Sequence, residues 1–104
     1  MKHHEEALFR FLAENMPELQ RFVPHIASFL VEDMNDGSMG SLRFCHSHGP
    51  QAFGREVGAV EVLDLDGKPV SVSVNLDRNE NLFEIDVFKC DSSPTIRLEL
   101  RLRR

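Results

Sequence analysis

The 104-residue sequence has no apolar run near the ~20 residues that a membrane-spanning helix requires. Its opening, Met-Lys-His-His-Glu-Glu, has neither an apolar signal core nor a small-residue cleavage site. With only two cysteines, it also lacks the disulfide framework of a small secreted domain. We therefore expect a cytoplasmic protein without a membrane segment, in which Cys45 and Cys90 remain free and partly buried thiols.

The motifs of common catalytic and cofactor sites are missing as well. There is no G-x-G-x-x-G, no P-loop and no G-x-S-x-G. His46 follows Cys45, but neighbouring strand residues point to opposite faces and make a poor nucleophile–base couple. The segments 64–67 and 77–81 resemble the start of a calcium loop but lack its later ligands, so we interpret both as hairpin turns. These absences favour a protein that is not an enzyme and needs no cofactor.

His46 and His48 are the candidate metal ligands. On a strand, the H-x-H spacing places both imidazoles on one side, as a metal site needs. No third ligand is visible in the sequence, although His25 or a carboxylate is available to supply one after folding. Because Gly49-Pro50 ends the strand, we favour an exposed pair of loop histidines over a zinc site.

Charge is unevenly distributed along the chain, whose net charge is −5. The segment 56–91 holds nine acidic against three basic residues, a net charge of −6. The segment 97–104 holds four arginines against one glutamate, but they alternate with apolar residues as on one solvated face of a strand. An acidic body disfavours nucleic acid as a partner and favours a protein with a basic surface.

Hydrophobic patterning predicts two helices followed by strands. Leu8, Leu12 and Met16 recur at helical spacing, while Pro17 suits the first turn of a second short helix that Pro24 ends. The expected strands, joined by short turns, are these segments: 26–34, 39–46, 57–64, 69–77, 82–90 and 95–102. We predict one α+β domain, residues 1–104, in which the helices pack on one face of a mainly antiparallel meander of about five to six strands.

Register can be inferred for two hairpins, because a slip of one residue would place carboxylates opposite valines. If a three-residue loop ends at Gly67, Val62 lies opposite Val70. A four-residue loop in the next hairpin, 78–81, places Val74 opposite Ile85. The core face then consists of Val60, Val62, Val70, Val72, Val74, Leu76, Phe83, Ile85 and Val87.

The same register predicts a polar outer face. Ser73 lies beside Asp86 and Asn75 beside Glu84, and we expect both carboxylates to be solvated. The spacing of Glu84 and Asp86 is also compatible with paired acid and base carboxylates. The outer face carries Glu61, Ser71, Ser73, Asn75, Glu84, Asp86 and Phe88.

Three segments resemble a pattern of small bacterial domains of unknown function. They are Met-Gly-Ser-Leu at 39–42, Asp-Leu-Asp-Gly at 64–67, and Leu-Phe-Glu-Ile-Asp-Val-Phe-Lys-Cys-Asp-Ser-Ser-Pro at 82–94. The family pattern is M-G-S-L, D-x-D-G and L-F-E-L-D-x-W-K-x-D-F-S-P, and the sequence departs from it at Phe88 and Ser92. The resemblance, over about residues 32–94, implies no activity. It marks as polar or special positions Gly40, Glu84, Asp86, Lys89 and Asp91.

Two functional hypotheses follow. The first is a non-catalytic protein-binding module, regulatory or toxin-neutralising, that presents its acidic sheet face to a basic partner; a homodimer through the C-terminal strand is a further partner hypothesis. The candidate binding residues are Glu61, Ser73, Asn75, Glu84, Asp86, Lys89 and Asp91. The alternative is a small enzyme or ligand-binding domain with a site around Glu84, Asp86, Asn75 and Arg43. A deep pocket over the two carboxylates would favour the alternative.

Overall fold

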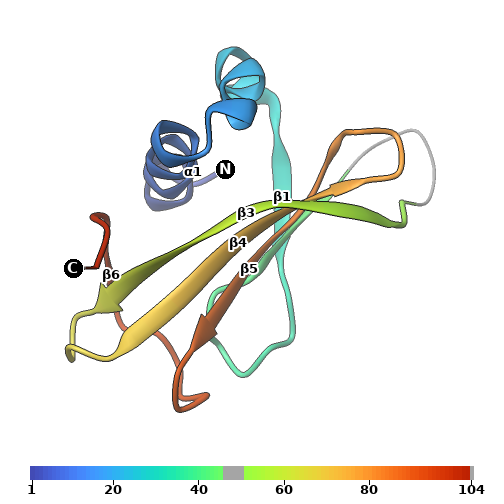
Figure 1. The fold of residues 1–104 in the computed structure, drawn as a ribbon. Helices are drawn as coiled ribbons and strands as arrows, with labels where there is room; N and C mark the ends of the chain where they lie inside the picture. The colour runs from blue at the N-terminus through green and yellow to red at the C-terminus, as the bar shows by residue number, and fades with distance from the viewer. Residues whose placement is uncertain (46–50, 104) are drawn as a thin grey trace.

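The computed structural model describes residues 1–45 and 51–103. Helix α1 (His3–Asn15) begins with Glu5 and Glu6 in its first turn, where the Glu5 carboxylate accepts the Lys2 backbone N–H at 2.7 Å. It turns an apolar face to the sheet, on which Phe9 and Leu12 are completely buried. The expected first helix is therefore present (Figure 1).

The second helix runs further than the sequence indicated. Element η1 (Pro17–Ser28) is a 3₁₀ helix that contains Pro24, so the proline does not end it. The fixed φ of proline suits a helical turn, and burial of Ile26 holds the following turn against the core. Because residues 26–28 are helical, the strand expected from residue 26 starts only at Leu30.

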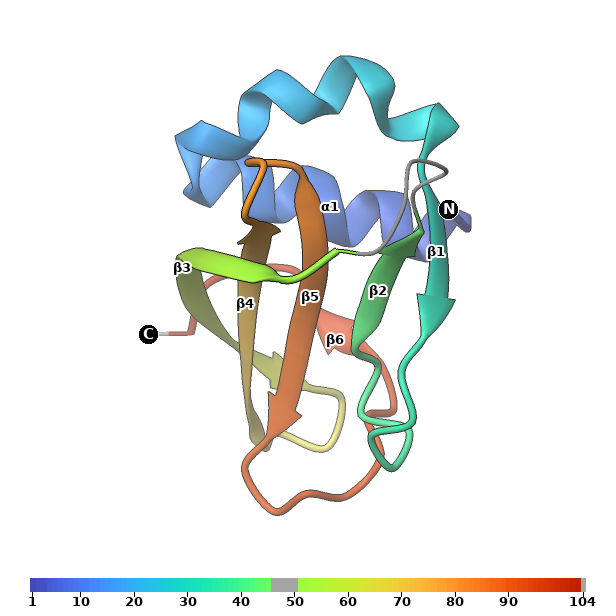
Figure 2. The ribbon, with the colours of Figure 1, turned by 90° about the vertical axis from the view of Figure 1, so that its right-hand side faces the viewer.

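A six-stranded antiparallel sheet follows, which confirms the predicted α+β fold class. Its strands are β1 (Leu30–Asp33), β2 (Leu42–Cys45), β3 (Phe53–Asp64), β4 (Pro69–Asp77), β5 (Leu82–Lys89) and β6 (Leu98–Glu99). In space their order is β1-β2-β5-β4-β3-β6. The β1–β2 hairpin is thus added beside β5 at one end of the β3–β4–β5 meander (Figure 2). At the other end of the strand order, β6 pairs with β3.

Two strands differ in length from the prediction. Strand β3 begins at Phe53 and not at residue 57, and two irregularities in its pairing with β4 let it bend around the sheet. Strand β6 comprises two residues, although alternation predicted a strand over 95–102. The backbone N–H groups of Ile96 and Arg97 donate to the Asp64 carboxylate and not to a neighbouring strand, so the regular ladder is confined to the next two residues.

The predicted register of both hairpins is confirmed. Val62 lies opposite Val70, and Val74 lies opposite Ile85. Gly67 has a φ of 81°, the left-handed conformation that its loop requires. These valines and Ile85 are completely buried between the sheet and the helices.

The second hairpin differs from the prediction at its tip. Leu76 lies opposite Leu82, and the Asp77 N–H donates to the Asn81 carbonyl, which leaves a loop of 78–80 and an irregularity at Phe83. As a result, Leu82 joins the hydrophobic core cluster in the place expected for Phe83. Phe83 remains buried outside that cluster.

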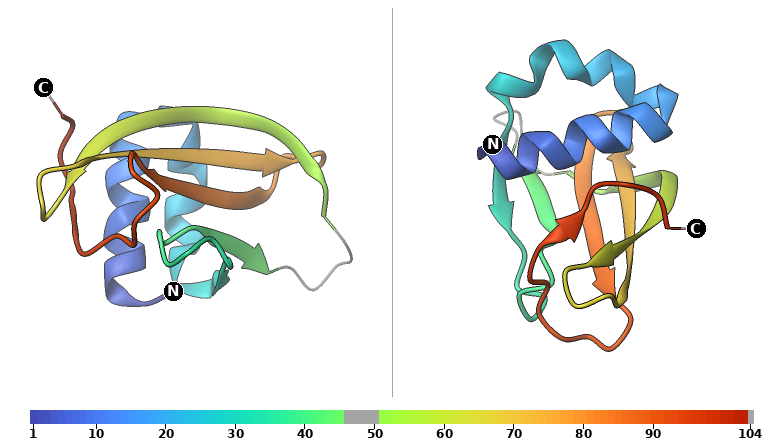
Figure 3. Two further views of the ribbon diagram at one scale, coloured as in Figure 1. Left: turned by 90° about the horizontal axis from the view of Figure 1, so that it is seen from below. Right: turned by 90° about the vertical axis from the view of Figure 1, so that its left-hand side faces the viewer.

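The two faces of the sheet have different surroundings. Both helices lie on one face, where they cover the core (Figure 1). Seen from the opposite side, the helices lie behind the sheet, and none crosses the outer face of β4 and β5 (Figure 3, left). The polar side chains predicted for the outer face are therefore not covered by a helix.

Candidate functional site

A row of polar side chains crosses the outer face over five neighbouring strands. In each adjacent pair of strands its members lie directly opposite each other. We call this set the polar row; it consists of Glu32, Arg43, Glu84, Asn75 and Glu56. Asp86 lies two residues further along β5, on the same face and opposite Ser73. The structure thus brings together the four residues of the alternative site, Arg43, Asn75, Glu84 and Asp86.

Glu84 is not the freely solvated carboxylate that the sequence led us to expect. It accepts a hydrogen bond from the Arg43 guanidinium at 2.9 Å, and its side chain is only 12% exposed. The same guanidinium lies 5.2 Å from the centre of the Phe83 ring. Because β2 pairs with β5, a residue far away in sequence shields the carboxylate, and the spacing within one strand could not reveal this contact.

Asp86 is half-buried, and within residues 1–45 and 51–103 it forms no ion pair. Its Oδ2 atom accepts a hydrogen bond from the Asn75 side-chain amide at 2.8 Å. Burial and the neighbouring charge of Glu84 raise the pKa of Asp86 above its usual value, although the Asn75 hydrogen bond opposes this. The negative charge at this position therefore costs folding free energy.

We expect Asp86→Asn to increase the stability of the domain, because asparagine can still accept the Asn75 hydrogen bond but carries no charge. The gain should be below about 1 kcal/mol, since the group retains contact with solvent. Because the pKa of Asp86 is raised in the folded state, the loss of folding free energy caused by its charge is largest above that pKa. The loss vanishes at low pH, where Asp86 is protonated in both the folded and the unfolded state. Thermal unfolding should therefore show a higher melting temperature for the variant at pH 7, and a smaller difference at about pH 3. An equal or lower melting temperature at pH 7 would contradict this account of Asp86.

Lys89 occupies a different environment. Its side chain is 1% exposed, and its Nζ donates to Asp64 Oδ2 at 2.7 Å and to Asp66 Oδ2 at 2.6 Å. The two carboxylates raise the pKa of Lys89 to about 12. Burial alone would raise the pKa of Asp64, but Lys89 and backbone N–H groups outweigh it and hold the value at about 2. Lys89 is thus placed in an internal ion-pair network and not on the outer face.

The network fixes the C-terminal segment, residues 94–100, which we call the strap. The Asp64 carboxylate accepts the backbone N–H groups of Ile96 at 2.8 Å and Arg97 at 2.7 Å. Lys89 Nζ donates to the Pro94 carbonyl at 3.3 Å. The Thr95 hydroxyl donates to the Met39 carbonyl at 2.9 Å. Two of the three segments that carry the family resemblance, 64–67 and 82–94, therefore meet around this strap, and the third contacts it through Met39.

The special positions of the third segment also have structural roles. Gly40 has a φ of 102°, and a Cβ atom there would lie 3.4 Å from the Thr95 hydroxyl oxygen. The Ser41 hydroxyl donates to the Val87 carbonyl at 3.2 Å and accepts the Val87 N–H at 2.8 Å, which extends the contact between β2 and β5. The Met-Gly-Ser-Leu segment thus joins the strap to the sheet.

Asp91, another special position of the family pattern, does not pair with Lys89. The Asp91 carboxylate instead accepts a hydrogen bond from Lys68 Nζ at 2.5 Å and another from the Ser93 hydroxyl at 2.6 Å. These contacts hold the pKa of Asp91 well below its usual range. Glu61, also a candidate binding residue, lies away from the polar row and accepts a hydrogen bond from Arg103 at 2.5 Å.

The remaining candidates contribute no defined site. His46 and His48 lie outside the described residues. Within residues 1–45 and 51–103, no group of three His, Cys, Asp or Glu side chains is placed to hold a metal ion. Cys45 and Cys90 are free thiols and both are exposed, whereas we expected them to be partly buried. No helix in the described part of the chain is long and apolar enough to cross a membrane.

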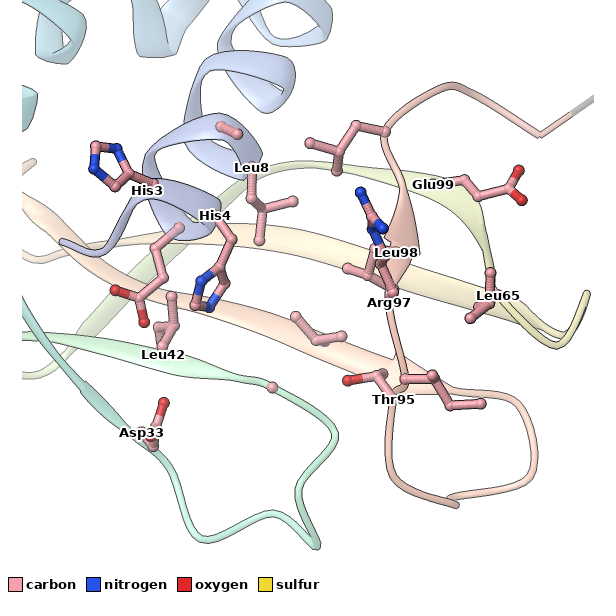
Figure 4. Close-up of a pocket in the computed structure, with 16 residues that line it drawn as sticks. His3, His4, Leu8, Asp33, Leu42, Leu65, Thr95, Arg97, Leu98 and Glu99 are labelled. Carbon is pink, nitrogen blue, oxygen red and sulfur yellow. The ribbon is translucent and has the colours of Figure 1, made fainter.

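Two cavities lie away from the polar row. The larger, of about 1130 Å³, lies between α1 and the strap (Figure 4). The smaller, of about 380 Å³, lies beside η1 and is lined by Phe22 and Phe29 among others. Neither is lined by a residue of the polar row, so neither provides a pocket over Glu84 and Asp86.

Comparison with known proteins gives a family but no function. The model of a domain of unknown function, DUF6984, matches residues 1–99, and the chain belongs to this family. No curated protein and no solved structure matches the chain. Membership agrees with the resemblance to an uncharacterised family and adds no substrate or partner.

Proposed function

We propose that this member of the DUF6984 family is a non-catalytic binding module that uses the polar row, together with Asp86, to bind a basic segment of another protein. The arrangement of charge carries the proposal. Four carboxylates, those of Glu32, Glu56, Glu84 and Asp86, share this area with the single guanidinium of Arg43, a net charge of −3. A lysine or arginine from a partner would offset part of this excess.

The exposure and composition of the surface support a binding role. Glu32 and Glu56 are exposed at the two ends of the polar row. Phe88, on the same face of β5, is 53% exposed and offers an apolar contact beside the charges. The row is spread over five strands, which suits an extended partner segment better than a small substrate.

The enzyme or ligand-site alternative receives less support. Arg43, Asn75, Glu84 and Asp86 do converge, but none of them lines either of the two cavities described above. Moreover, Glu84 is engaged by Arg43, so it is not an unpartnered acid or base.

Location and oligomeric state enter as parts of the same proposal. The exposed free thiols of Cys45 and Cys90 suit a reducing cytoplasm. A homodimer through the C-terminal strand is the weaker partner hypothesis, because Arg103 N–H already donates to the Glu61 carbonyl along the outer edge of β3. A regulatory or toxin-neutralising role would use the polar row in the same way.

The test uses the double variant Glu32→Lys with Glu56→Lys, which reverses both exposed ends and leaves the contacts of Glu84 and Asp86 intact. A synthetic peptide that alternates lysine and threonine serves as the probe, with affinity measured by calorimetry. We expect the unmodified protein to bind the peptide, and the variant to bind it about tenfold or more weakly. The affinity of the unmodified protein should also fall as salt is raised.

The matched control is Glu6→Lys with Glu14→Lys on α1, which changes the net charge by the same amount away from the polar row. Circular dichroism checks that both double variants are folded. Retention of affinity by the control supports the proposal. Equal loss in both variants would mean that only net charge matters, and would overturn it, as would the absence of peptide binding at low salt.

A further inference from the structure

The groove between α1 and the strap has the construction of a ligand site. Its floor is the core face of the sheet, where Leu42 and Val87 are buried. One wall is the first half of α1, and the other is the strap (Figure 4). Its volume, about 1130 Å³, is slightly above the ~300–1,000 Å³ of small-molecule pockets and leaves room for an elongated ligand.

The mouth of the groove is unusually apolar for this molecule. Seven large apolar side chains are strongly exposed in the described part of the chain, and three of them, Leu65, Ile96 and Leu100, line this groove. Apolar side chains that are exposed singly are common on protein surfaces. A group of them around one cavity indicates a binding surface. An apolar portion of a ligand would bury them.

The strap wall is fixed before any ligand binds. The Asp64 carboxylate accepts hydrogen bonds from two consecutive backbone N–H groups of the strap. Lys89 Nζ donates to the Pro94 carbonyl, and the Thr95 hydroxyl donates to the Met39 carbonyl. Burial of the Lys89 and Asp64 charges carries a desolvation cost, which makes such a pair a poor source of stability but a good means of fixing one geometry. A pre-formed wall reduces the ordering cost of ligand binding.

The charges around the groove are placed asymmetrically. Arg97 extends from the strap toward α1, and His4 extends from α1 over the floor (Figure 4). No ion pair within residues 1–45 and 51–103 involves Arg97.

The acidic groups that face the groove do not occupy Arg97. Glu5 caps α1 through the Lys2 N–H, and Glu99 forms an ion pair with Arg101 at 3.1 Å. Asp33 lies at the opposite side of the groove from Arg97 (Figure 4). His3 lines the same end of α1 as His4. Arg97 is thus available to an anion on the strap side of the groove.

We propose that this groove binds an amphipathic carboxylic acid, with its carboxylate at Arg97 and its unbranched apolar chain along Leu42 and Val87. The site is separate from the polar row, so it is independent of the binding function proposed above. The inference is one of binding alone.

The probe is decanoate, kept below its micelle concentration, and backbone amide shifts in ¹H–¹⁵N NMR spectra report both location and affinity. We expect saturable shifts centred on Ala7, Leu65 and Ile96. Arg97→Gln should weaken binding by about tenfold, because a charge-assisted contact is lost. Decanol, which has the same chain without the charge, should bind as weakly to the unmodified protein as decanoate does to this variant.

Two substitutions on exposed residues separate the groove from general surface effects. Ala7→Trp fills the groove from α1 and should abolish binding, whereas Ala27→Trp on η1 adds the same side chain elsewhere and should not. Arg78→Gln, in the loop after β4, is the charge control for Arg97→Gln and should leave the affinity unchanged. Scattered or non-saturable shifts, equal binding of decanol and decanoate, or unchanged affinity in Ala7→Trp would overturn the inference.

Discussion

Lys89→Met is expected to remove a large part of the folding free energy of this domain. The substitution leaves Asp64, whose side chain is completely buried, without its cation. Removal of one partner from a buried ion pair typically costs about 3–5 kcal/mol. The whole stability of a small domain is about 5–15 kcal/mol. Three backbone N–H groups still donate to Asp64, so we expect a loss near about 3 kcal/mol, measured by chemical denaturation.

The matched control for this prediction is Lys68→Met. Lys68 also pairs with an aspartate, Asp91, at 2.5 Å, but the two side chains are 49% and 37% exposed. An exposed pair contributes about 0–1 kcal/mol, so the same substitution should be nearly silent there. Similar losses in both variants would mean that burial of the Lys89 pair carries no special energetic weight.

The effect of Lys89→Met should also depend on pH in a defined direction. The folded-state pKa of Asp64, about 2, lies below its usual 3.8, so its favourable contribution is present above the usual pKa and is lost as pH falls toward the folded-state value. The stability difference between the unmodified protein and the variant should therefore be full at pH 7 and shrink between about pH 4 and pH 2. A second variant, Lys89→Met with Asp64→Asn, should recover part of the loss at pH 7, since no unpaired charge remains buried.

The sequence already contained the signal for this network, although we assigned Asp64 and Asp66 only to a turn. Alternation along β5 places Lys89 on the same face as Ile85 and Val87, which is the core face. A lysine at a core position requires carboxylate partners. The register of β4 and β5 places Lys89 opposite Val70, one hairpin away from the aspartates. The alternation along β5 therefore predicts a buried ion pair for Lys89. It does not say which carboxylate is the partner.

Local patterns predicted the hairpins well because each depends on neighbouring residues. The pairings of Val62 with Val70 and of Val74 with Ile85 follow from alternation and turn length. The insertion of β2 beside β5 is different, because it joins segments separated by about forty residues and no local pattern specifies it. The contact of Arg43 with Glu84 follows from that insertion, and so does the polar row.

The groove was hidden from the sequence for a related reason. Alternation over 95–102 predicted a continuous strand. The contacts of residues 94–97 with Lys89 and Asp64 replace strand pairing at the start of this segment, and residues 94–100 form the strap instead. The apolar residues of this segment then line a cavity with α1, and only Leu98 and Glu99 pair with β3. A pattern of alternating residues indicates one apolar face but cannot say whether that face meets a strand or borders a groove.

Val72→Asp is expected to unfold the domain. Val72 is completely buried on β4, with Val60 opposite it on β3 and Val87 opposite it on β5. An aspartate there would place a carboxylate among valines, without a hydrogen-bond donor. The free energy needed to bury this unpaired charge exceeds the whole free energy of unfolding of a domain of this size. Circular dichroism and the NMR spectrum should show an unfolded chain at pH 7, where the carboxylate is ionised.

The neighbouring variant Ser71→Asp gives this prediction its control. Ser71 follows Val70 on the same strand but is exposed on the outer face, opposite Glu61 and Phe88. The same new side chain should cost below about 1 kcal/mol there, mainly through repulsion from Glu61. A loss of that size lowers the melting temperature by less than about 4–8 °C. If Val72→Asp melted within that range as well, Val72 would not lie in the core, and the outer face that presents Glu84 and Asp86 would have to be assigned anew.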